Sequence, residues 1–493
     1  MTFTSELLGL KINNKLCDAR SEYVGADNVE SITLESEDGY FIYRRTLFLV
    51  LTTAFCRLFP DYRLKLHRSI NKSTYCRVYS NVLFDSRHIS RMRAEMDKII
   101  AADMIIKEKD GKYTIDTEFM DFGGPLAAHT GVLHKYDIAE REGGFVLLYP
   151  NNRTNGLVSP YSSSEHLMKA IDEYSLWSDI LNINEVCDIN RIIANGKSSD
   201  MINVQEALHD KKISEIANRI KLLQPNVKAI LISGPSSSGK TTFSRKLAVN
   251  LRVNGMKPVN ISLDNYYHNR DKTPRHADGS YNFEDLEAID YELFNSHLAA
   301  LIRGEEIEAP VFDFQLSRRA DIGHRVKLEE GGVVIIEGIH ALNERLTYSI
   351  ESKNKFKIYC SPLADLNISD IYPVAASDVR LVRRIVRDNL FRNSDAERTL
   401  SMWKSVQDGE IKNVFRYNET ADCIFNTAII YECSVFKPFI EPLLNAMTQN
   451  SVYYPQAQRL FDLFSQFEPM DSYFVPSTSL LREFIGGSSY HGA

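Results

Sequence analysis

The chain opens with short stretches in which hydrophobic and polar residues alternate, as over 31–35. Alternation of this kind is typical of strands with one buried face. The tripeptide Glu37-Asp38-Gly39 that follows has the composition of a turn. We therefore expect residues 1–45 to form a small β-rich segment.

Helical and strand-like patterns are mixed over the next part of the chain. Residues 89–106 repeat hydrophobic side chains at helical spacing, whereas 75–79 and 144–148 read as strands. The most apolar run, 47–59, is shorter than the roughly twenty residues of a membrane span and is expected to be a buried helix. Residues 46–200 are predicted to form an α+β domain.

After this region the pattern becomes strand, turn and helix in repetition. A helical stripe covers 201–224 and ends at Gln224-Pro225-Asn226, so a domain boundary is expected within or just before this helix. The strands predicted after it are 228–233, 259–263, 333–336, 356–359 and 423–426. This alternation predicts an α/β domain with a doubly wound parallel sheet, assigned to 201–493 with a C-terminal helical extension.

A phosphate-binding sequence lies at the first of these strand-to-helix turns. It reads GPSSSGKTT over 234–242 and matches the pattern GxxxxGK[ST]. Glycines let backbone N–H groups close around phosphate oxygens, Lys240 reaches the outer phosphates, and the Thr241 hydroxyl can bind magnesium. The predicted nucleoside triphosphate site consists of Gly234, Ser236, Ser237, Ser238, Gly239, Lys240, Thr241 and Thr242.

Carboxylates end two of the predicted strands. Asp264 follows the strand 259–263, and Glu337 follows 333–336. Ligands of open parallel sheets gather at the carboxyl ends of strands, and phosphoryl transfer needs Mg²⁺ and a carboxylate near the attacking hydroxyl. These acids are candidates for both roles. The alternative for each residue alone is a polar cap of a buried strand.

Arginines recur at helical spacing further along the chain. They are Arg380, Arg383, Arg384 and Arg387, followed by Arg392. Such a row is also typical of a solvated helix face. Its apolar neighbours leave little purely polar surface, and arginines neutralise the charge of a transferring phosphate well, so we interpret the row as a charge clamp.

The composition is that of an ordinary soluble protein with several domains. Its 493 residues are 25% charged with a net charge of −7, which gives no overall attraction to nucleic acid or anionic membranes. The seven cysteines form no CxxC pairs, and the N-terminus lacks the pattern of a signal peptide. We expect a reducing, cytoplasmic location.

Six segments resemble the uridine kinase and phosphoribulokinase family in order and spacing. They are 234–242, 262–267, 282–290, 310–314, 336–339 and 380–388. The resemblance implies a P-loop kinase that uses ATP and Mg²⁺. Such a kinase transfers the γ-phosphoryl group, by in-line attack, to a hydroxyl of a nucleoside resembling uridine or cytidine, or of a related small molecule.

The same resemblance implies roles for individual residues. Asp264 is the base that accepts the proton of the acceptor hydroxyl, and Thr241, Asp264 and Glu337 hold Mg²⁺. Lys240 and Arg387 act on the reacting phosphates, with Arg392 near them. The acceptor pocket contains Tyr267, Glu284, Phe312, Ser317 and Arg384.

The pattern departs from that of uridine kinases in the acceptor pocket. Ser317 stands where those enzymes carry a histidine that reads the pyrimidine ring, and Phe312 stands for a tyrosine. Their Arg-Gly-Arg sequence is replaced by Arg392-Asn393-Ser394. Losing a hydrogen-bonding ring removes discrimination of about 1 to 3 kcal/mol, so the acceptor base stays open.

The N-terminal half resembles the accessory domain that precedes a uridine kinase-like domain in some bacterial proteins. That domain is itself similar to the editing region of threonyl-tRNA synthetases. The segments concerned are 59–60, 67–70, 74–77 and 130–133, and 475–487 resembles the end of those proteins. Editing domains use an HxxxH pair with a later cysteine and histidine.

This chain lacks the metal-binding spacing of those editing domains. His67 is followed four residues later by Asn71, and His129 and His134 are five residues apart. We therefore predict no zinc. A small-molecule or tRNA-acceptor pocket around His67 and Cys76 is a separate hypothesis.

Two alternatives to a nucleoside kinase are kept. One is a kinase of a non-nucleoside alcohol or a sugar phosphate. The other is a nucleotide-switched regulatory protein that binds tRNA or other RNA, against which the acidic net charge and the lack of interleaved basic and aromatic residues over 1–200 argue. The expected partner is a small-molecule acceptor rather than nucleic acid or a membrane. The oligomeric state and the preference for ATP over GTP stay open.

Overall fold

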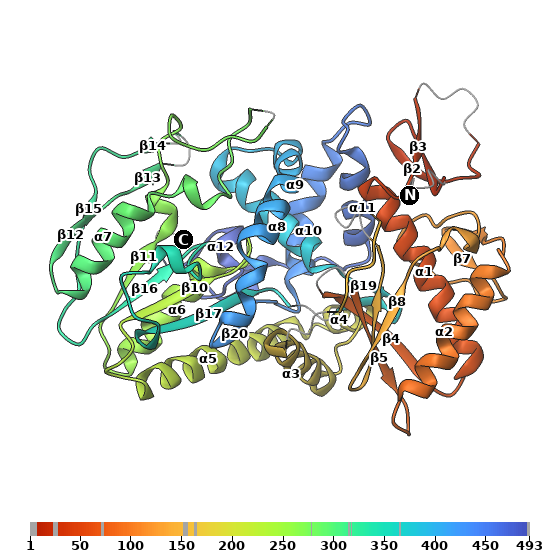
Figure 1. Ribbon diagram of the computed structural model, residues 1–493, viewed down its shortest axis with the longest axis horizontal. Helices are drawn as coiled ribbons and strands as arrows, with labels where there is room; N and C mark the ends of the chain where they lie inside the picture. The colour runs from red at the N-terminus through yellow and green to blue at the C-terminus, as the bar shows by residue number, and fades with distance from the viewer. Residues whose placement is uncertain are drawn as a thin grey trace.

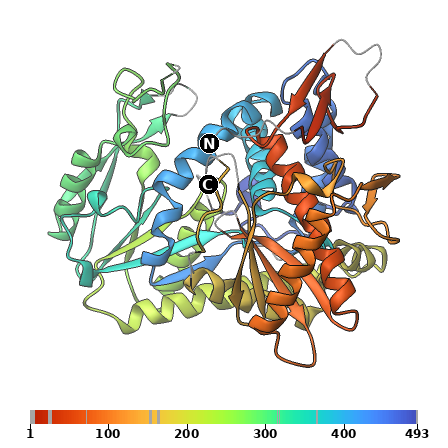
Figure 2. The ribbon, with the colours of Figure 1, turned by 45° about the vertical axis from the view of Figure 1, so that its right-hand side comes forward.

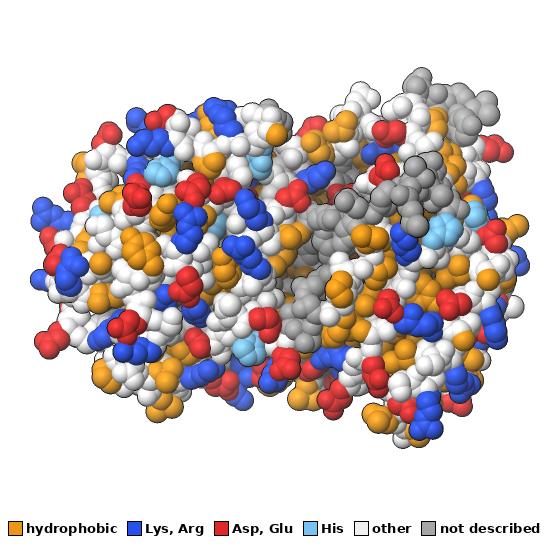
Figure 3. Space-filling model, in the orientation of Figure 1, with side chains coloured by type: hydrophobic (Ala, Val, Ile, Leu, Met, Phe, Trp, Pro, Cys, Tyr) orange, Lys and Arg blue, Asp and Glu red, His pale blue; other side chains and the backbone are white. Residues whose placement is uncertain are grey.

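The computed structural model shows two units side by side (Figures 1 and 2). It describes residues 7–22, 28–70, 73–150, 156–161, 165–277, 279–313, 316, 318–363 and 366–490, without the side chains of 68–70. On the face drawn in Figure 3, acidic and basic side chains of the described residues are interspersed over both units. None of the described helices is long and apolar enough to cross a membrane.

The chain begins with a small antiparallel sheet and a long helix. Strands β1 (Gly9–Ile12), β2 (Lys15–Asp18) and β3 (Val29–Ile32) pair in the order β2-β1-β3, and α1 (Glu37–Leu58) follows. The expected turn at 37–39 is wrong, because these residues form the first turn of α1. Ser36 caps the helix by accepting a hydrogen bond from the Gly39 N–H. The expected segment end at 45 therefore falls inside a helix.

The rest of the N-terminal unit is built on a second antiparallel sheet. Its strands β4 (Arg63–Ile70), β5 (Ser73–Tyr79), β9 (Gly144–Leu148) and β8 (Asp137–Arg141) lie in that order. Side chains alternate between its faces: Cys76 and Phe145 pack with α1 and α2 (Ser86–Ala101), whereas Tyr75 and Val146 pack with α3 (Glu165–Leu181). The short hairpin β6 (Lys107–Lys109) and β7 (Lys112–Thr114) completes this unit.

The second unit contains the predicted parallel sheet. Its strands are β11 (Pro258–Ser262), β16 (Val333–Glu337), β10 (Ala229–Ser233), β17 (Lys355–Ser361) and β20 (Cys423–Asn426), parallel and in that order. Each overlaps a strand predicted from the sequence. Helices cover both faces, so the central strands β10 and β16 are buried along their whole length.

The helices around this sheet form two layers. One face is covered by α5 (Ser198–Leu222), α6 (Lys240–Val253), α8 (Ala376–Arg392), α9 (Ala396–Asn413), α10 (Glu432–Asn445), α11 (Tyr454–Ser465) and α12 (Arg482–Ile485). The other face packs against α7 (Tyr291–Ile302). Short paired strands lie outside the layers: β12 (Glu306–Ala309) with β15 (His324–Lys327), β13 (Phe312–Asp313) with β14 (Arg318–Arg319), and β18 (Asn367–Ser369) with β19 (Tyr372–Pro373).

The core of the second unit reaches further back along the chain than the boundary expected near 200. Helix α4 (Val186–Ala194) packs into it, and the core begins at Ile183. Helix α3 belongs by its packing to the N-terminal sheet. The division between the hydrophobic cores therefore falls between these two helices.

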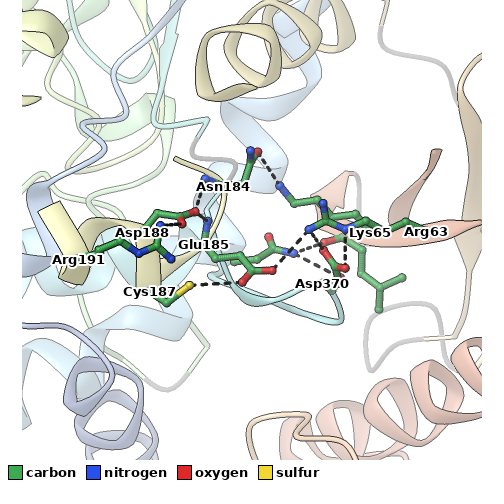
Figure 4. A network of polar contacts seen from close by, with 10 residues as sticks. Arg63, Lys65, Asn184, Glu185, Cys187, Asp188, Arg191 and Asp370 are labelled. Atoms are coloured by element: carbon green, nitrogen blue, oxygen red, sulfur yellow. Dashed lines mark hydrogen bonds and ion pairs between the residues drawn. The ribbon is translucent and has the colours of Figure 1, made fainter. Parts of the chain in front are cut away.

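Polar contacts join the units along the edge strand β4 (Figure 4). Arg63 donates two hydrogen bonds of 2.7 Å to the carboxylate of Asp370, and the Lys65 ammonium donates to Asn184 Oδ1 at 3.3 Å. The Leu66 N–H donates to the Asp370 carbonyl at 2.7 Å, and the Asn367 amide donates to the Leu66 carbonyl at 2.8 Å. The turn between β18 and β19 is thereby fixed against the N-terminal sheet.

Candidate functional site

The phosphate loop connects β10 to α6, and two of its glycines are required by its geometry. A Cβ on Gly234 would lie 1.9 Å from the Cys360 carbonyl oxygen, so no larger residue fits there. Gly239, the residue just before α6, has φ +82°, a conformation that favours glycine. The loop therefore has the close-packed backbone that the sequence pattern predicts.

The interior of the loop keeps polar groups out of solvent. The Lys240 ammonium donates hydrogen bonds of 2.9 Å to the carbonyl oxygens of Gly234 and Pro235. The hydroxyls of Ser237 and Ser238 are buried and have no hydrogen-bond partner among the described residues. Buried hydroxyls without partners are costly, and phosphate oxygens would satisfy them. The loop therefore fits the phosphates of ATP.

Two distant carboxylates hold backbone groups of this loop. Glu410 of α9 accepts a hydrogen bond of 2.8 Å from the Ser236 N–H. Glu483 of α12 accepts from both the N–H and the hydroxyl of Thr242, at 3.0 and 2.9 Å. The sequence analysis assigned neither residue a role. No local pattern marks them, because each is far from the loop along the chain and joins it only in the fold.

The arginines of α8 divide into two groups. Arg380 forms two hydrogen bonds with Glu410, at 2.5 and 2.9 Å, and Arg383 forms two with Glu432, at 2.6 and 3.0 Å. Both guanidinium groups also donate to carbonyl oxygens of the phosphate loop. Their charges are already balanced. The interpretation of the whole row as a phosphate clamp is therefore wrong for these two, which brace the loop instead.

The other arginines surround Asp388, which is buried and which the sequence analysis did not single out. Arg384, Arg387 and Arg392 lie 3.3, 3.0 and 3.4 Å from its carboxylate. Burial opposes ionisation of Asp388, yet the charges of the three arginines hold its pKa below the ordinary value. Three cations for one carboxylate leave positive charge beside the phosphate loop, and Arg384 also donates to the Ser236 hydroxyl at 2.9 Å.

The electrostatic repulsion among these guanidinium groups is clearest at Arg392. Its pKa falls to about 10, because the charge of Arg387 opposes its protonation and burial adds to that effect. An anion bound beside these guanidinium groups would relieve their repulsion. The charge-neutralising role of Arg384, Arg387 and Arg392 stays a prediction, and this excess of positive charge is compatible with it.

The two predicted carboxylates meet at the carboxyl ends of neighbouring strands. Ser262, which ends β11, is paired in register with Glu337 at the end of β16, and its hydroxyl donates to Glu337 at 2.6 Å. Asp264 follows in the next turn and is half-buried. Burial and the charge of Asp264 raise the pKa of Glu337 to about 7, an effect that the Ser262 hydrogen bond and Lys240 oppose.

This arrangement fits a magnesium ion. Thr241, Asp264 and Glu337 offer only oxygen atoms, which Mg²⁺ prefers. A divalent cation would balance the repulsion that raises the Glu337 pKa. Among the described residues, no group of three or more His, Cys, Asp or Glu side chains is placed to hold a metal. The magnesium site of two carboxylates and one hydroxyl stays a prediction.

The predicted acceptor pocket lies beside Asp264. The Tyr267 hydroxyl donates to the Phe283 carbonyl at 3.1 Å, and its ring centre is 5.7 Å from that of Phe312. Burial is the main cause that raises the pKa of Glu284 to about 7, and the charge of Arg384 opposes it. One carboxylate oxygen of Glu284 is buried without a hydrogen-bond partner in the described part of the chain. Ser317 lies outside the described residues.

The predicted residues of the N-terminal unit lie in its core. His67 on β4 and Cys76 on β5 are 1% and 0% exposed, and burial raises the pKa of the Cys76 thiol. His129 instead contacts Asp103 near the surface. The pocket around His67 and Cys76 stays a hypothesis.

Comparison with known proteins identifies relatives of the second unit. The Phosphoribulokinase / Uridine kinase family model matches residues 229–431. A uridine kinase of Halobacterium salinarum is 33% identical over 179 residues, which cover 36% of this chain and 70% of that protein. A uridine kinase of Deinococcus deserti is 30% identical over 172 residues, which cover 35% and 73%.

One solved structure, described as a possible uridine kinase from Bacillus stearothermophilus, aligns with 44% of this chain and 98% of its own. It shares 19% identity and has a TM-score of 0.30. The matched family region lies within the second unit, so the resemblance of the N-terminal unit to an editing region stays a prediction. From the sequence matches, the chain belongs to the phosphoribulokinase and uridine kinase family of ATP-dependent kinases.

Proposed function

We propose that this protein transfers the γ-phosphoryl group of ATP to a hydroxyl of a nucleoside or a closely related small molecule. The observation that carries the proposal is the convergence of Asp264, Glu284 and Glu337 beside the phosphate loop. The charge of Asp264 raises the pKa of both other carboxyls, and that of Lys240 lowers both. Four charged groups that influence one another in this way share one site.

Asp264 is the proposed general base. It lies at the carboxyl end of β11, where ligands of parallel sheets bind, and it is less buried than Glu337. From this position it would accept the proton of the attacking hydroxyl. Lys240, Arg387 and Arg392 would balance charge on the transferring group. Mg²⁺ held by Thr241, Asp264 and Glu337 would supply further neutralisation of phosphate oxygens.

The acceptor pocket suits a molecule with a flat ring and several hydroxyls. The rings of Tyr267 and Phe312 offer an aromatic surface, and the unpaired oxygen of Glu284 needs a hydrogen-bond donor. A ribose hydroxyl is such a donor. Two relatives named uridine kinases support the same acceptor class.

The decisive experiment is a screen of acceptors by ADP release. Uridine, cytidine, purine nucleosides, sugars, sugar phosphates and hydroxy acids are each added with Mg²⁺ and ATP, and products are identified by mass spectrometry. We expect phosphorylation of at least one nucleoside and little ADP without acceptor. Turnover of only a sugar phosphate or a hydroxy acid would replace the nucleoside by that acceptor. ATP hydrolysis independent of any acceptor, by protein that retains RNA at moderate salt, would favour the regulatory alternative.

A further inference from the structure

A cavity lies between the two units and borders the phosphate loop, whose Pro235 is part of its lining. Its volume is about 490 Å³, the size range of sites for nucleotide-sized molecules. Helix α1 of the N-terminal unit and α11 of the second unit both contribute side chains to its lining, and both lie along the boundary in Figures 1 and 2. The β4 contacts of Figure 4 hold the two units together near this boundary.

Three arginines converge on one ring in this cavity. The guanidinium groups of Arg44, Arg45 and Arg459 lie 5.1, 5.9 and 5.4 Å from the centre of the Phe41 ring. Like charges gathered at this distance repel one another. Cation–π contacts with a single phenylalanine offset only part of that repulsion.

The charges around the cavity do not balance. Its described lining contains five cationic and three acidic side chains. Two of the acids are already paired: Asp378 with Arg459, at 2.8 Å for the longer hydrogen bond, and Glu410 with Arg380. Among the described residues, neither Arg44 nor Arg45 has a carboxylate within ion-pair distance.

Of the three arginines around Phe41, Arg45 is the most buried, so the unbalanced charge is least screened by water there. The residue is 6% exposed, and no hydrogen bond to its guanidinium group is found in the described part of the chain. Burial, together with the charges of Arg44 and Arg459, lowers its pKa to about 10. A buried arginine without hydrogen-bond partners is strongly unfavourable unless an anion joins it.

We propose that this cavity binds the oxyanion group of a small organic molecule, a phosphate ester or a carboxylate, on Arg44 and Arg45. The rings of Tyr40, Phe48 and Tyr372 line the same cavity and would contact the rest of that molecule. The site differs from the kinase site, although Arg380 and Glu410 line the cavity and also hold the phosphate loop.

The first test measures binding of simple oxyanions to the full chain. The phosphate loop is saturated with Mg²⁺ and a non-hydrolysable ATP analogue, and ionic strength is kept constant with sodium chloride. Inorganic phosphate and succinate are then titrated while the melting temperature is followed. A ligand of the folded state raises the melting temperature. A rise with phosphate alone indicates a phosphate ester, a rise with succinate alone a carboxylate, and a rise with neither overturns the proposal.

Variants locate the site. Arg45→Met should abolish the oxyanion-dependent rise, whereas Arg303→Met, at an exposed ion pair just after α7, should leave it intact. Without added anion, Arg45→Met should melt at or above the wild-type temperature, because it removes an unpaired buried charge. A merely structural arginine would show the opposite change. An undiminished rise in Arg45→Met overturns the proposal.

A direct measurement does not depend on any variant. Crystals of the wild-type chain with the filled phosphate loop are soaked in selenate, whose anomalous signal locates the ion. We expect selenate within hydrogen-bonding distance of the Arg45 guanidinium. Selenate bound only elsewhere contradicts the proposed site, and this outcome leaves the kinase assignment untouched because Asp264 and Glu337 lie outside the cavity.

Discussion

The kinase site and the cavity between the units are opposite in charge and alike in physical character. In the kinase site, Glu337 is buried and Glu284 is half-buried near Asp264, and their pKa values rise to about 7. In the cavity, Arg45 is buried near two other arginines, and its pKa falls to about 10. Each site contains side chains of one sign whose charge is incompletely balanced where little water can screen it.

The difference lies in what each site lacks. Excess carboxylate is relieved by a divalent cation or by hydroxyl donors, which ATP, Mg²⁺ and an acceptor supply. Excess guanidinium is relieved by an oxyanion. Paired charges such as Arg383 and Glu432 show the contrast, because both are fully buried and yet form two mutual hydrogen bonds. Unbalanced buried charge, rather than buried charge itself, therefore marks the binding sites of this molecule.

The largest expected effect is at the acidic site. Asp264→Asn should lower kcat by about a hundred- to ten-thousand-fold, because a general base is lost, while the affinity for ATP changes little. The measurement is steady-state kinetics with an acceptor found in the screen, together with nucleotide binding. Asp271→Asn, at an exposed aspartate of the same loop, is the matched control. Full activity of Asp264→Asn would exclude the proposed base.

The next largest effect is expected at the ion pair of Arg380 and Glu410, which lines the cavity and also contacts the phosphate loop. Glu410→Gln leaves Arg380 buried without its carboxylate, so the free energy of unfolding should fall by about 3 to 5 kcal/mol. Lys412→Met removes an exposed ion pair of the same helix and should cost at most about 1 kcal/mol. Denaturant unfolding of both variants tests this difference. Equal losses would show that burial does not decide the value of these pairs.

The pH dependence of stability distinguishes the acidic site from the arginine cavity. Folded protein keeps a proton on Glu337 up to pH about 7, whereas the unfolded chain releases it near 4.5. The wild type therefore loses stability as the pH rises between these values. Glu337→Gln should not share this loss and should be more stable above pH 7, by about 3 kcal/mol, without advantage below 4.5.

This prediction is checked by thermal unfolding of the nucleotide-free protein between pH 4 and 8. Glu330→Gln, at an exposed position, is the control and should follow the wild type throughout. A constant difference between Glu337→Gln and the wild type at all pH values would contradict the assigned titration.

The smallest effect is expected at the exposed ion pair between Arg63 of β4 and Asp370 of the turn between β18 and β19. Arg63 is 52% exposed, although it forms two short hydrogen bonds with Asp370. Arg63→Ala should lower the free energy of unfolding by no more than about 1 kcal/mol, because water screens the pair in both states. Denaturant unfolding provides the measurement. A loss comparable to that of Glu410→Gln would mean that exposed charges matter here as much as buried ones.

Much of the kinase unit could be predicted from local sequence. The five strands were predicted because each is a short apolar run between turns, and the phosphate loop was predicted because its glycines and lysine occur at fixed spacing. The first turn of α1 was missed. Gly39 is typical of a turn by composition, but it lies in the first turn of α1, which Ser36 caps. A glycine is needed at this place in the helix because a Cβ would be 1.8 Å from the Thr33 carbonyl oxygen.

The sequence by itself determined the parallel sheet, the phosphate loop and the membership of α8 arginines in one helical row, because these depend on neighbours within a few residues. Only the tertiary structure decided which arginines are paired. Glu410 and Glu432 neutralise two of them across the fold, and Asp388 gathers three more. In the part of the chain that the structure describes, no carboxylate lies within ion-pair distance of Arg45. Whether a charge is balanced depends on the distance between side chains in the folded protein. For residues far apart in the chain, the sequence alone does not give that distance.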